Sequence, residues 1–373
     1  FQFRAWDQTS GTQGTKVDTS VNGGTSAFSS ATETADITTT SVNDAPTLGN
    51  GALVSTLEDT AGPPGQTVTT IFTGQFSDVD NGSSMNGIAV LGNTASAGTQ
   101  GTWQYSTNSG TNWFAIGSVT DGATALAIGN STLIRFLPVA NYSGTPTALT
   151  VRGLDNTYAG SFSTTAGTET RVAINTTTNG GTTAIAGATA NLSTAITSVN
   201  DAPVRTAGAP AAISVNEDSA NVTAVTLGMG SLTYSPGGGS DESGQTLTYT
   251  VTVIPAHMTL WKADGVTQVT SSTVITLTEL QGLKYKTVAD ANGTGNLTWT
   301  VVDNGGTANG GVNTLTETLA ITVTAVNDAP VRTAGAPAAI NVNEDSANVT
   351  AVTLGMSGLT YGSGGGADES GQT

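Results

Sequence analysis

Apolar and polar residues alternate with a period of two along much of the chain. Leu247, Tyr249, Val251 and Val253 alternate with threonines, and the same spacing recurs at 297–301 and 319–325. This period is typical of antiparallel strands that bury one face. Clusters of Asp, Asn, Gly and Ser separate the runs, as turns do in a sandwich. No window has a convincing helical period, so the pattern predicts an all-β chain of antiparallel β-sandwiches with about seven to nine strands each.

The pentapeptide Val-Asn-Asp-Ala-Pro, here called the hinge, closes three of these runs, at 42–46, 199–203 and 326–330. The copies lie about one domain length apart. Residues 204–246 and 331–373 align without a gap and differ at six positions, and 149–155 resembles 1–7. We therefore predict four parts: the C-terminal part of a long repeat at 1–46, a complete long repeat at 47–203, a complete short repeat at 204–330, and the N-terminal part of another short repeat at 331–373.

Composition narrows the possible partners. The chain carries 27 acidic and 10 basic residues, which gives a net charge of −17. Such a surface repels nucleic acid and anionic lipid and attracts divalent cations. There is no cysteine for a disulfide or thiol chemistry, and no apolar run approaches the roughly 20 residues of a membrane span. Because Phe1 and Thr373 both fall inside repeats, we expect the chain to be a piece of a longer protein.

Acidic side chains recur at turns. They lie in the Asn-Asp pair of each hinge, in the turn Asp78-Val-Asp80, and where an apolar strand ends, at Asp7, Asp155 and Asp303. Calcium takes about six to eight oxygen ligands from carboxylates and carbonyls on loops. Asp and Asn at turns also cap backbone groups without any metal. Both interpretations stay open for each cluster.

In their order along the chain, these motifs resemble those of the cadherin family and its bacterial cadherin-like relatives in giant surface adhesins. The resemblance covers nearly the whole chain. It includes Glu58-Asp59, Asn216-Glu217-Asp218, the Asp-x-Asp-x-Gly turn, the strand-final Asp and the hinge, which is similar to the cadherin linker. Residues 137–145 are similar to a Pro-x-x-Asn-Tyr-x-Gly signature of the bacterial repeats.

The resemblance implies one calcium cluster at each hinge. The first would use Asn43, Asp44, Asp78, Asp80 and Asp155. The second would use Asn200, Asp201, Asp241 and Asp303, with Glu58 reaching from the preceding domain. The third would use Glu217, Asp290, Asn327 and Asp328. In the short repeat, Ser243 stands where the turn should have its second Asp, so that site either loses a charge or takes Glu242 instead.

The function that the resemblance implies is a non-enzymatic structural segment of a very long bacterial surface or secreted protein. Calcium would stiffen a stalk or extracellular filament that serves adhesion, biofilm formation or surface assembly, with neighbouring copies or repeats as partners. An extracellular location would keep such weak calcium sites loaded. We also expect residues 1–46 and 331–373, each only part of a sandwich, to pack through unpaired edge strands against a neighbouring copy or a continuation of the polymer.

Two other functions have less support in the sequence. A glycan-binding module would stack sugars on Trp103 and Trp113, which flank the turn at 108–110, although Trp and Tyr two residues apart more commonly face a core. An enzyme is not expected, because His257 is the single histidine and cannot build a zinc site or a Ser-His-Asp triad without further partners. Close acidic pairs lie only at hinges and loops.

Overall fold

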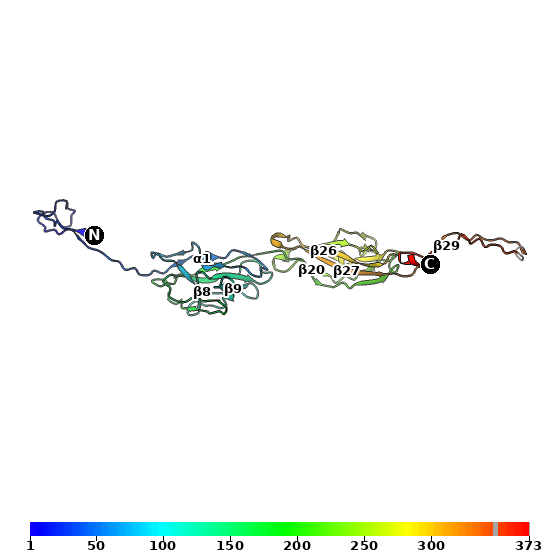
Figure 1. Ribbon diagram of the computed structural model, residues 1–373, viewed down its shortest axis with the longest axis horizontal. Coiled ribbons are helices and arrows are strands. Elements are labelled where there is room, and N and C mark those ends of the chain that lie inside the picture. Colours follow the sequence, from blue (N-terminus) through cyan, green and yellow to red (C-terminus); the bar gives the residue numbers. More distant parts are fainter. Residues whose placement is uncertain (346–349, 373) are drawn as a thin grey trace.

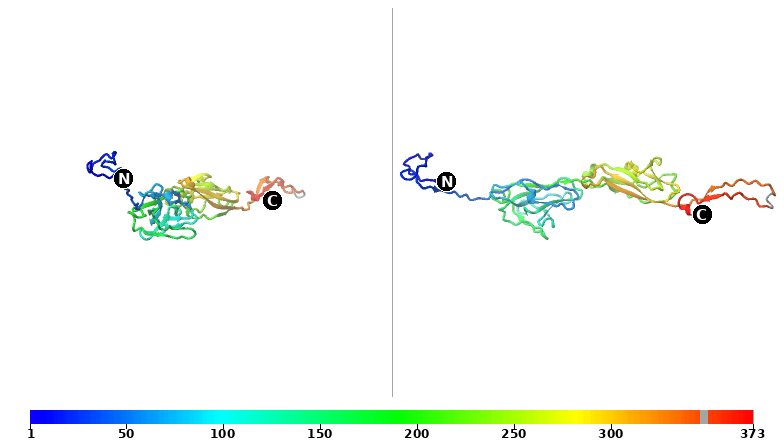
Figure 2. Two further views of the ribbon diagram at one scale, coloured as in Figure 1. Left: turned by 60° about the vertical axis from the view of Figure 1, so that its left-hand side comes forward. Right: turned by 45° about the horizontal axis from the view of Figure 1, so that its top comes forward.

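The computed structural model describes residues 1–345 and 350–372; residues 346–349 and 373, which belong to the predicted partial repeat 331–373, lie outside the described residues. Two β-sandwiches lie end to end along a rod, with residues 1–46 beyond one and residues from 331 onward beyond the other (Figure 1). The rod remains elongated in both further views of Figure 2. Its regular structure consists mainly of strands, so the all-β prediction is confirmed.

The first sandwich is built from strands between Thr47 and Thr197. One sheet has the order β10 (Phe114–Ala115), β9 (Gly101–Ser106), β12 (Leu133–Pro138) and β6 (Gln66–Thr67). The other has the order β14 (Ala173–Ile174), β11 (Ala125–Gly129), β8 (Met85–Gly92), β13 (Leu149–Asp155), β15 (Ala190–Ser193) and β4 (Gly51–Ala52). Two short pairs complete it: β3 (Thr47–Leu48) with β7 (Phe76–Ser77), and β5 (Thr56–Leu57) with β16 (Ile196–Thr197). The two main sheets have four and six strands. Their total exceeds the roughly seven to nine strands predicted for one sandwich, because it includes edge strands of only two residues.

The first sandwich buries side chains on both faces of its larger sheet. Between the sheets lies a core whose largest members are Trp103, Tyr105, Phe72 and Phe136. On the opposite face Leu154, Ile174 and Ile185 form a second cluster with small neighbours. The chain between β13 and β15 covers this cluster. The additional length of the long repeat therefore shields the outer face of the larger sheet.

The second sandwich is built from strands between Val204 and Thr324. One sheet has the order β18 (Ile213–Asn216), β27 (Thr314–Thr324), β26 (Gly293–Val302), β21 (Thr248–Val253) and β24 (Thr273–Ile275). The other has the order β19 (Val225–Thr226), β25 (Lys284–Thr287), β22 (Met258–Trp261) and β23 (Gln268–Val269), and β17 (Val204–Ala207) pairs with β20 (Thr233–Ser235). The predicted alternation holds in β26, where Leu297, Trp299 and Val301 are buried.

The early strands that pair with the closing strands of each sandwich depart from the antiparallel prediction. β18 runs parallel to β27, and β4 and β5 run parallel to β15 and β16. Because these early strands and the closing strands point the same way, the chain enters each sandwich at one end and leaves at the other, here called its entry and exit poles. This direction places the ends of β5 and β18 beside the next hinge.

Within the described residues, two short helices occur in the all-β fold. α1 (Val68–Ile71) and α2 (Leu277–Gln281) are each about one turn long. Thr276 and Glu279 form a reciprocal capping box at the start of α2. This Thr-x-x-Glu spacing was readable in the sequence as a helix start. Short 3₁₀ turns also occur at η1 (Asp241–Gly244), η2 (Ala308–Gly310) and η3 (Asp368–Gly371).

The two end segments contain little regular structure. β1 (Gln2–Phe3) pairs with β2 (Glu33–Thr34), and β28 (Val331–Ala334) pairs with β29 (Thr360–Gly362). Met356 is 48% exposed, whereas Met229, its counterpart in the short sandwich, is 1% exposed. The same side chain is therefore buried in one copy and uncovered in the other. The contacts expected with neighbouring copies stay a prediction.

Candidate cation sites at the sandwich junctions

All three hinges share one hydrogen-bond framework. The side-chain amide of the hinge Asn donates to the carbonyl of the next residue, at Asn43, Asn200 and Asn327. The backbone N–H of the hinge Asp donates to a carboxylate of the segment that follows, in the pairs Asp44 to Asp80 (2.7 Å), Asp201 to Glu242 (3.1 Å) and Asp328 to Glu369 (2.9 Å). The first two hinges are thus anchored to the sandwich that they lead into, and the third to the C-terminal end segment. We call these places the first, second and third junctions, after their hinges.

A glutamate from the exit pole of the preceding sandwich joins the second and third junctions. Parallel pairing of β5 with β16 and of β18 with β27 places Glu58 and Glu217 beside the departing chain. Glu58 accepts a hydrogen bond from the backbone N–H of Val199, and Glu217 accepts one from Val326 at 2.7 Å. Both glutamates are buried. The link between neighbouring sandwiches therefore includes charged groups from both.

At the second junction three carboxylates converge. Oxygens of Glu58, Asp241 and Glu242 lie within 4.8 Å of one another. The second oxygens of Glu58 and Glu242 are buried and have no hydrogen-bond partner among the described residues, although these side chains are only 3% and 1% exposed. Oδ2 of Asp201 and Oδ2 of Asp303 are orphaned in the same way. Buried polar atoms are normally paired, so this set lacks a positive partner.

The electrostatics of the second junction agree with that conclusion. Burial raises the pKa of Glu58 to about 7, with further contributions from the charges of Asp241, Asp59 and Glu242, even though the Val199 N–H opposes the rise. Burial also raises the pKa of Asp201 and of Glu242. Ionised carboxylates at this junction are therefore destabilised unless a cation neutralises them.

The third junction gathers its carboxylates at a different place. Oxygens of Asp218, Asp290 and Asp328 lie within 4.8 Å of one another. Burial, together with the charges of Asp290 and Asp218, raises the pKa of Asp328. Oδ2 of Asp328 and Oε2 of Glu369 are buried without a partner in the part of the chain that the structure describes. These carboxylates also lack a positive counterpart.

The first junction is held by hydrogen bonds. Asn43 donates to Asp155 Oδ2 at 3.4 Å, and Asp155 is fully buried. Asp78 accepts from the backbone N–H of Asp80 at 3.1 Å and from the Ser83 hydroxyl at 2.6 Å. Among the described residues, the carboxylates of this junction form no group of three within 4.8 Å. The five residues predicted here are neighbours. Their carboxylates accept hydrogen bonds from backbone and side-chain groups, as expected if Asp and Asn cap turns without a metal.

At the other two junctions the structure brings the predicted residues together with others. Asn200 donates to Asp303 Oδ1 at 3.1 Å, and Glu242 occupies the position that the sequence left open beside Ser243. At the third junction Asn327 accepts from Gln372 at 3.1 Å. Six further residues of these sites were not among the predicted ligands: Asp59, Asn141, Asp218, Asn292, Asp368 and Glu369. The identity of 241–242 with 368–369 was the available signal for the last two.

Two glycine-rich loops fit against the preceding sandwich. A Cβ at Gly238 would collide with the Asn141 side chain, and one at Gly365 would collide with Asp290. Glycine at these positions therefore allows the loop of one sandwich to approach the exit pole of the other closely.

The tryptophans proposed for glycan contact do not form a platform. Trp103 is fully buried, and its indole N–H donates to the carbonyl of Thr147 at 2.9 Å. Trp113 is half-buried, with the Arg135 guanidinium 4.0 Å from its ring centre. Burial of Trp103 and Tyr105 agrees with the core assignment that their spacing favours, and it contradicts the alternative of sugar contact at Trp103.

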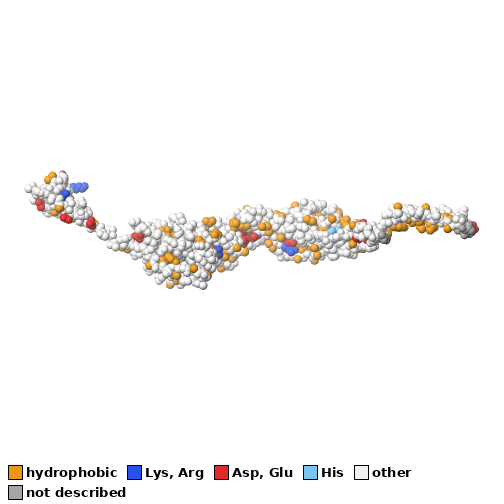
Figure 3. Space-filling view, in the orientation of Figure 1, with side chains coloured by type: hydrophobic (Ala, Val, Ile, Leu, Met, Phe, Trp, Pro, Cys, Tyr) orange, Lys and Arg blue, Asp and Glu red, His pale blue; other side chains and the backbone are white. Residues whose placement is uncertain are grey.

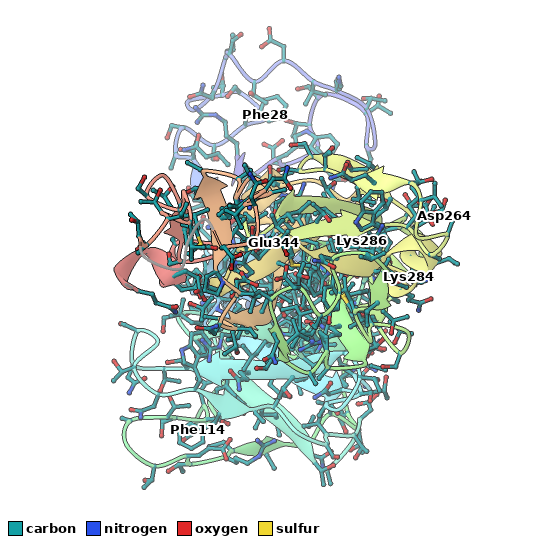
Figure 4. All side chains as sticks on the ribbon, turned by 90° about the vertical axis from the view of Figure 1, so that its right-hand side faces the viewer. Phe28, Phe114, Asp264, Lys284, Lys286 and Glu344 are labelled. Carbon is teal, nitrogen blue, oxygen red and sulfur yellow. The ribbon has the colours of Figure 1, made fainter. Side chains whose placement is uncertain are left out.

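Charge on the surface of the rod is unevenly distributed. In Figure 3 acidic side chains gather where the two sandwiches meet, while the flanks are mainly uncharged. The view along the rod in Figure 4 labels Lys284 and Lys286, both from β25 of the second sandwich. Lys286 Nζ lies 4.5 Å from the centre of the Trp261 ring.

No protein-family model and no curated protein matches the chain. Among solved structures it is similar to EC1-2 of human mucin-like protocadherin (12% identity, TM-score 0.28, 75% of this chain and 98% of that chain). It is also similar to the CupB6 tip adhesin from Pseudomonas aeruginosa (10% identity, TM-score 0.22, 76% and 99%) and to EC1-4 of Drosophila N-cadherin (12% identity, TM-score 0.20, 80% and 54%). At these TM-scores the similarities carry no weight for function. Among the described residues, no helix is long and apolar enough to cross a membrane.

Proposed function

We propose that this chain is a non-enzymatic structural segment of a very long bacterial surface or secreted repeat protein, and that calcium at its junctions stiffens a stalk or extracellular filament. The observation that carries the proposal is the group of buried, unpartnered carboxylate oxygens at the second junction, which come from both sandwiches. Glu58 belongs to the first sandwich, and Asp241 and Glu242 belong to the second.

The donor set favours calcium over other metals. The converging side chains offer oxygen only, and the chain has no cysteine and a single histidine. Hard cations such as calcium prefer carboxylate oxygens, whereas zinc prefers thiolate and imidazole. Bound calcium would neutralise the carboxylates and join two sandwiches through shared ligands. The residues themselves orient the hinge through the bonds from Val199 and Asp201.

The repeat boundaries at 46, 203 and 330 and the extracellular location belong to the same proposal. Each junction lies between strands of separate sheets, and the hinge itself offers little apolar surface to hold the sandwiches together. Rod stiffness would then depend on the cation. Neighbouring copies, paired through the exposed end segments, are the proposed partners in a fibrous assembly.

A calcium titration of the full chain tests the proposal. Isothermal calorimetry should detect calcium uptake with dissociation constants of roughly 10⁻⁴–10⁻³ M or tighter. Small-angle scattering in chelator should show a shorter, more flexible particle than in calcium. Magnesium at the same concentration is the control, because it dehydrates reluctantly and demands a stricter geometry. A chain that takes up no calcium at millimolar concentrations and keeps one shape throughout would overturn the proposal.

A further inference from the structure

The second and third junctions are built from equivalent residues. Residues 139–144 align without a gap with 288–293, and Val, Ala and the final Gly are identical. Asn141 and Asp290 occupy the same place, with left-handed φ values of 58° and 55°. The backbone N–H of Asn141 donates to Asp59 at 2.8 Å, and that of Asp290 donates to Asp218 at 3.4 Å. The two junctions can therefore be compared position by position.

Each junction contains two places where carboxylates can converge. The first, here called the glutamate position, is formed by Glu58, Asp241 and Glu242, or by Glu217, Asp368 and Glu369. The second, here called the aspartate position, is formed by Asp59, residue 141 and Asp201, or by Asp218, Asp290 and Asp328. The carboxylates within 4.8 Å of one another are those of the glutamate position at the second junction and those of the aspartate position at the third.

Two asparagines account for this difference. At the third junction the side-chain amide of Asn292 donates to Glu217 at 3.2 Å and to Asp368 at 3.0 Å. At the second junction the equivalent residue is Ser143, and Glu58 Oε2 has no partner among the described residues. Conversely, the aspartate position has a carboxylate at Asp290 but only an amide at Asn141.

We propose that calcium occupies the glutamate position at the second junction and the aspartate position at the third, and that residues 141 and 143, or 290 and 292, select between them. This inference rests on the proposed function. An amide NH₂ is a donor and cannot ligate through its hydrogens, so Asn292 satisfies one oxygen of Glu217 and one of Asp368 that a cation would otherwise take. Among the described residues, Glu369 alone keeps a buried unpartnered oxygen there. Asp290 adds a negative ligand, and the number of charged ligands tunes calcium affinity. The second and third junctions therefore differ in their affinity for calcium.

Matched substitutions in the full chain test the inference. Glu58→Gln and Glu217→Gln change equivalent residues, and each keeps an oxygen to accept the backbone N–H of Val199 or Val326. We expect Glu58→Gln to weaken calcium binding at the second junction by roughly tenfold or more, and Glu217→Gln to change calcium binding at the third junction less than twofold. Asp290→Asn should weaken calcium binding at the third junction by roughly tenfold or more. Asp36→Asn, in the exposed linker before the first hinge, controls for net charge.

Calorimetry gives the number of sites and their affinities, and anomalous scattering from crystals grown with calcium gives their places. Asn292→Ser should add calcium affinity at the glutamate position of the third junction. Equal losses from Glu58→Gln and Glu217→Gln, or cations at the same position in both junctions, would overturn the inference and leave the proposed function intact. A wild-type chain without calcium uptake would instead reject the proposed function.

Discussion

Replacing Glu58 with Gln isolates the effect of one buried charge at the second junction. Burial and its acidic neighbours raise the pKa of Glu58 from 4.5 to about 7. At pH 8 this rise corresponds to about 3 kcal/mol of unfavourable free energy for the ionised side chain in the calcium-free fold. The glutamine keeps the bond from Val199 and removes the charge. Because the hinge can open locally, 3 kcal/mol is the largest gain in unfolding free energy that the variant should show.

The assay is differential scanning calorimetry of the full chain, in chelator and in 10 mM calcium. In chelator at pH 8 the variant should melt up to about 10 °C higher than the wild type, given about 2–4 °C per kcal/mol for a domain of this size. Calcium should reduce that advantage by about 1.4 kcal/mol for every tenfold of affinity that the variant has lost. Glu33→Gln removes the same charge from an exposed strand and serves as the control.

The pH dependence gives a second measurement on the same pair of proteins. Because folding raises the pKa of Glu58, its contribution to stability is fully present below about 4.5 and is lost as the pH rises through about 7. In chelator the wild type should therefore lose stability between pH 5 and pH 8, and Glu58→Gln should lose less. Identical melting of both proteins in chelator, or an equal gain from calcium, would refute the reasoning from buried charge.

Three further predictions follow from the packing and the junctions. Gly238→Ala should loosen the second junction and lower calcium affinity because its Cβ meets Asn141, whereas Gly230→Ala, whose Cβ meets nothing, should match the wild type in calorimetric titration. Trp299→Ala should cost about 3–5 kcal/mol and lower only the melting transition of the second sandwich, and Trp103→Ala should do the same to the first; one shared transition in scanning calorimetry would contradict separate domains. Chelation should shorten the particle in small-angle scattering while the β signal in circular dichroism stays the same. If particle length and β signal fell together, the result would argue against cation-held junctions.

The fold class could be predicted from local pattern because strand formation depends on near neighbours. The alternation of Leu297, Trp299 and Val301 with polar residues indicates a half-buried strand without knowledge of its partners. The recurring hinge likewise predicted where acidic residues would gather, and the absence of cysteine limited the ligands to oxygen. The repeat boundaries derived from that hinge stay a prediction.

The tertiary structure decided which of these residues meet, because each junction joins segments that are distant in the chain. Glu58 contacts Val199, which lies 141 residues later, only because β5 runs parallel to β16 and ends at the same pole. No local pattern reports that pairing, so the roles of Asp218 and Asn292 were missed. The spacing of Trp103 and Tyr105 favoured the core, but only the second sheet, which covers them, decided between the core and an exposed sugar platform.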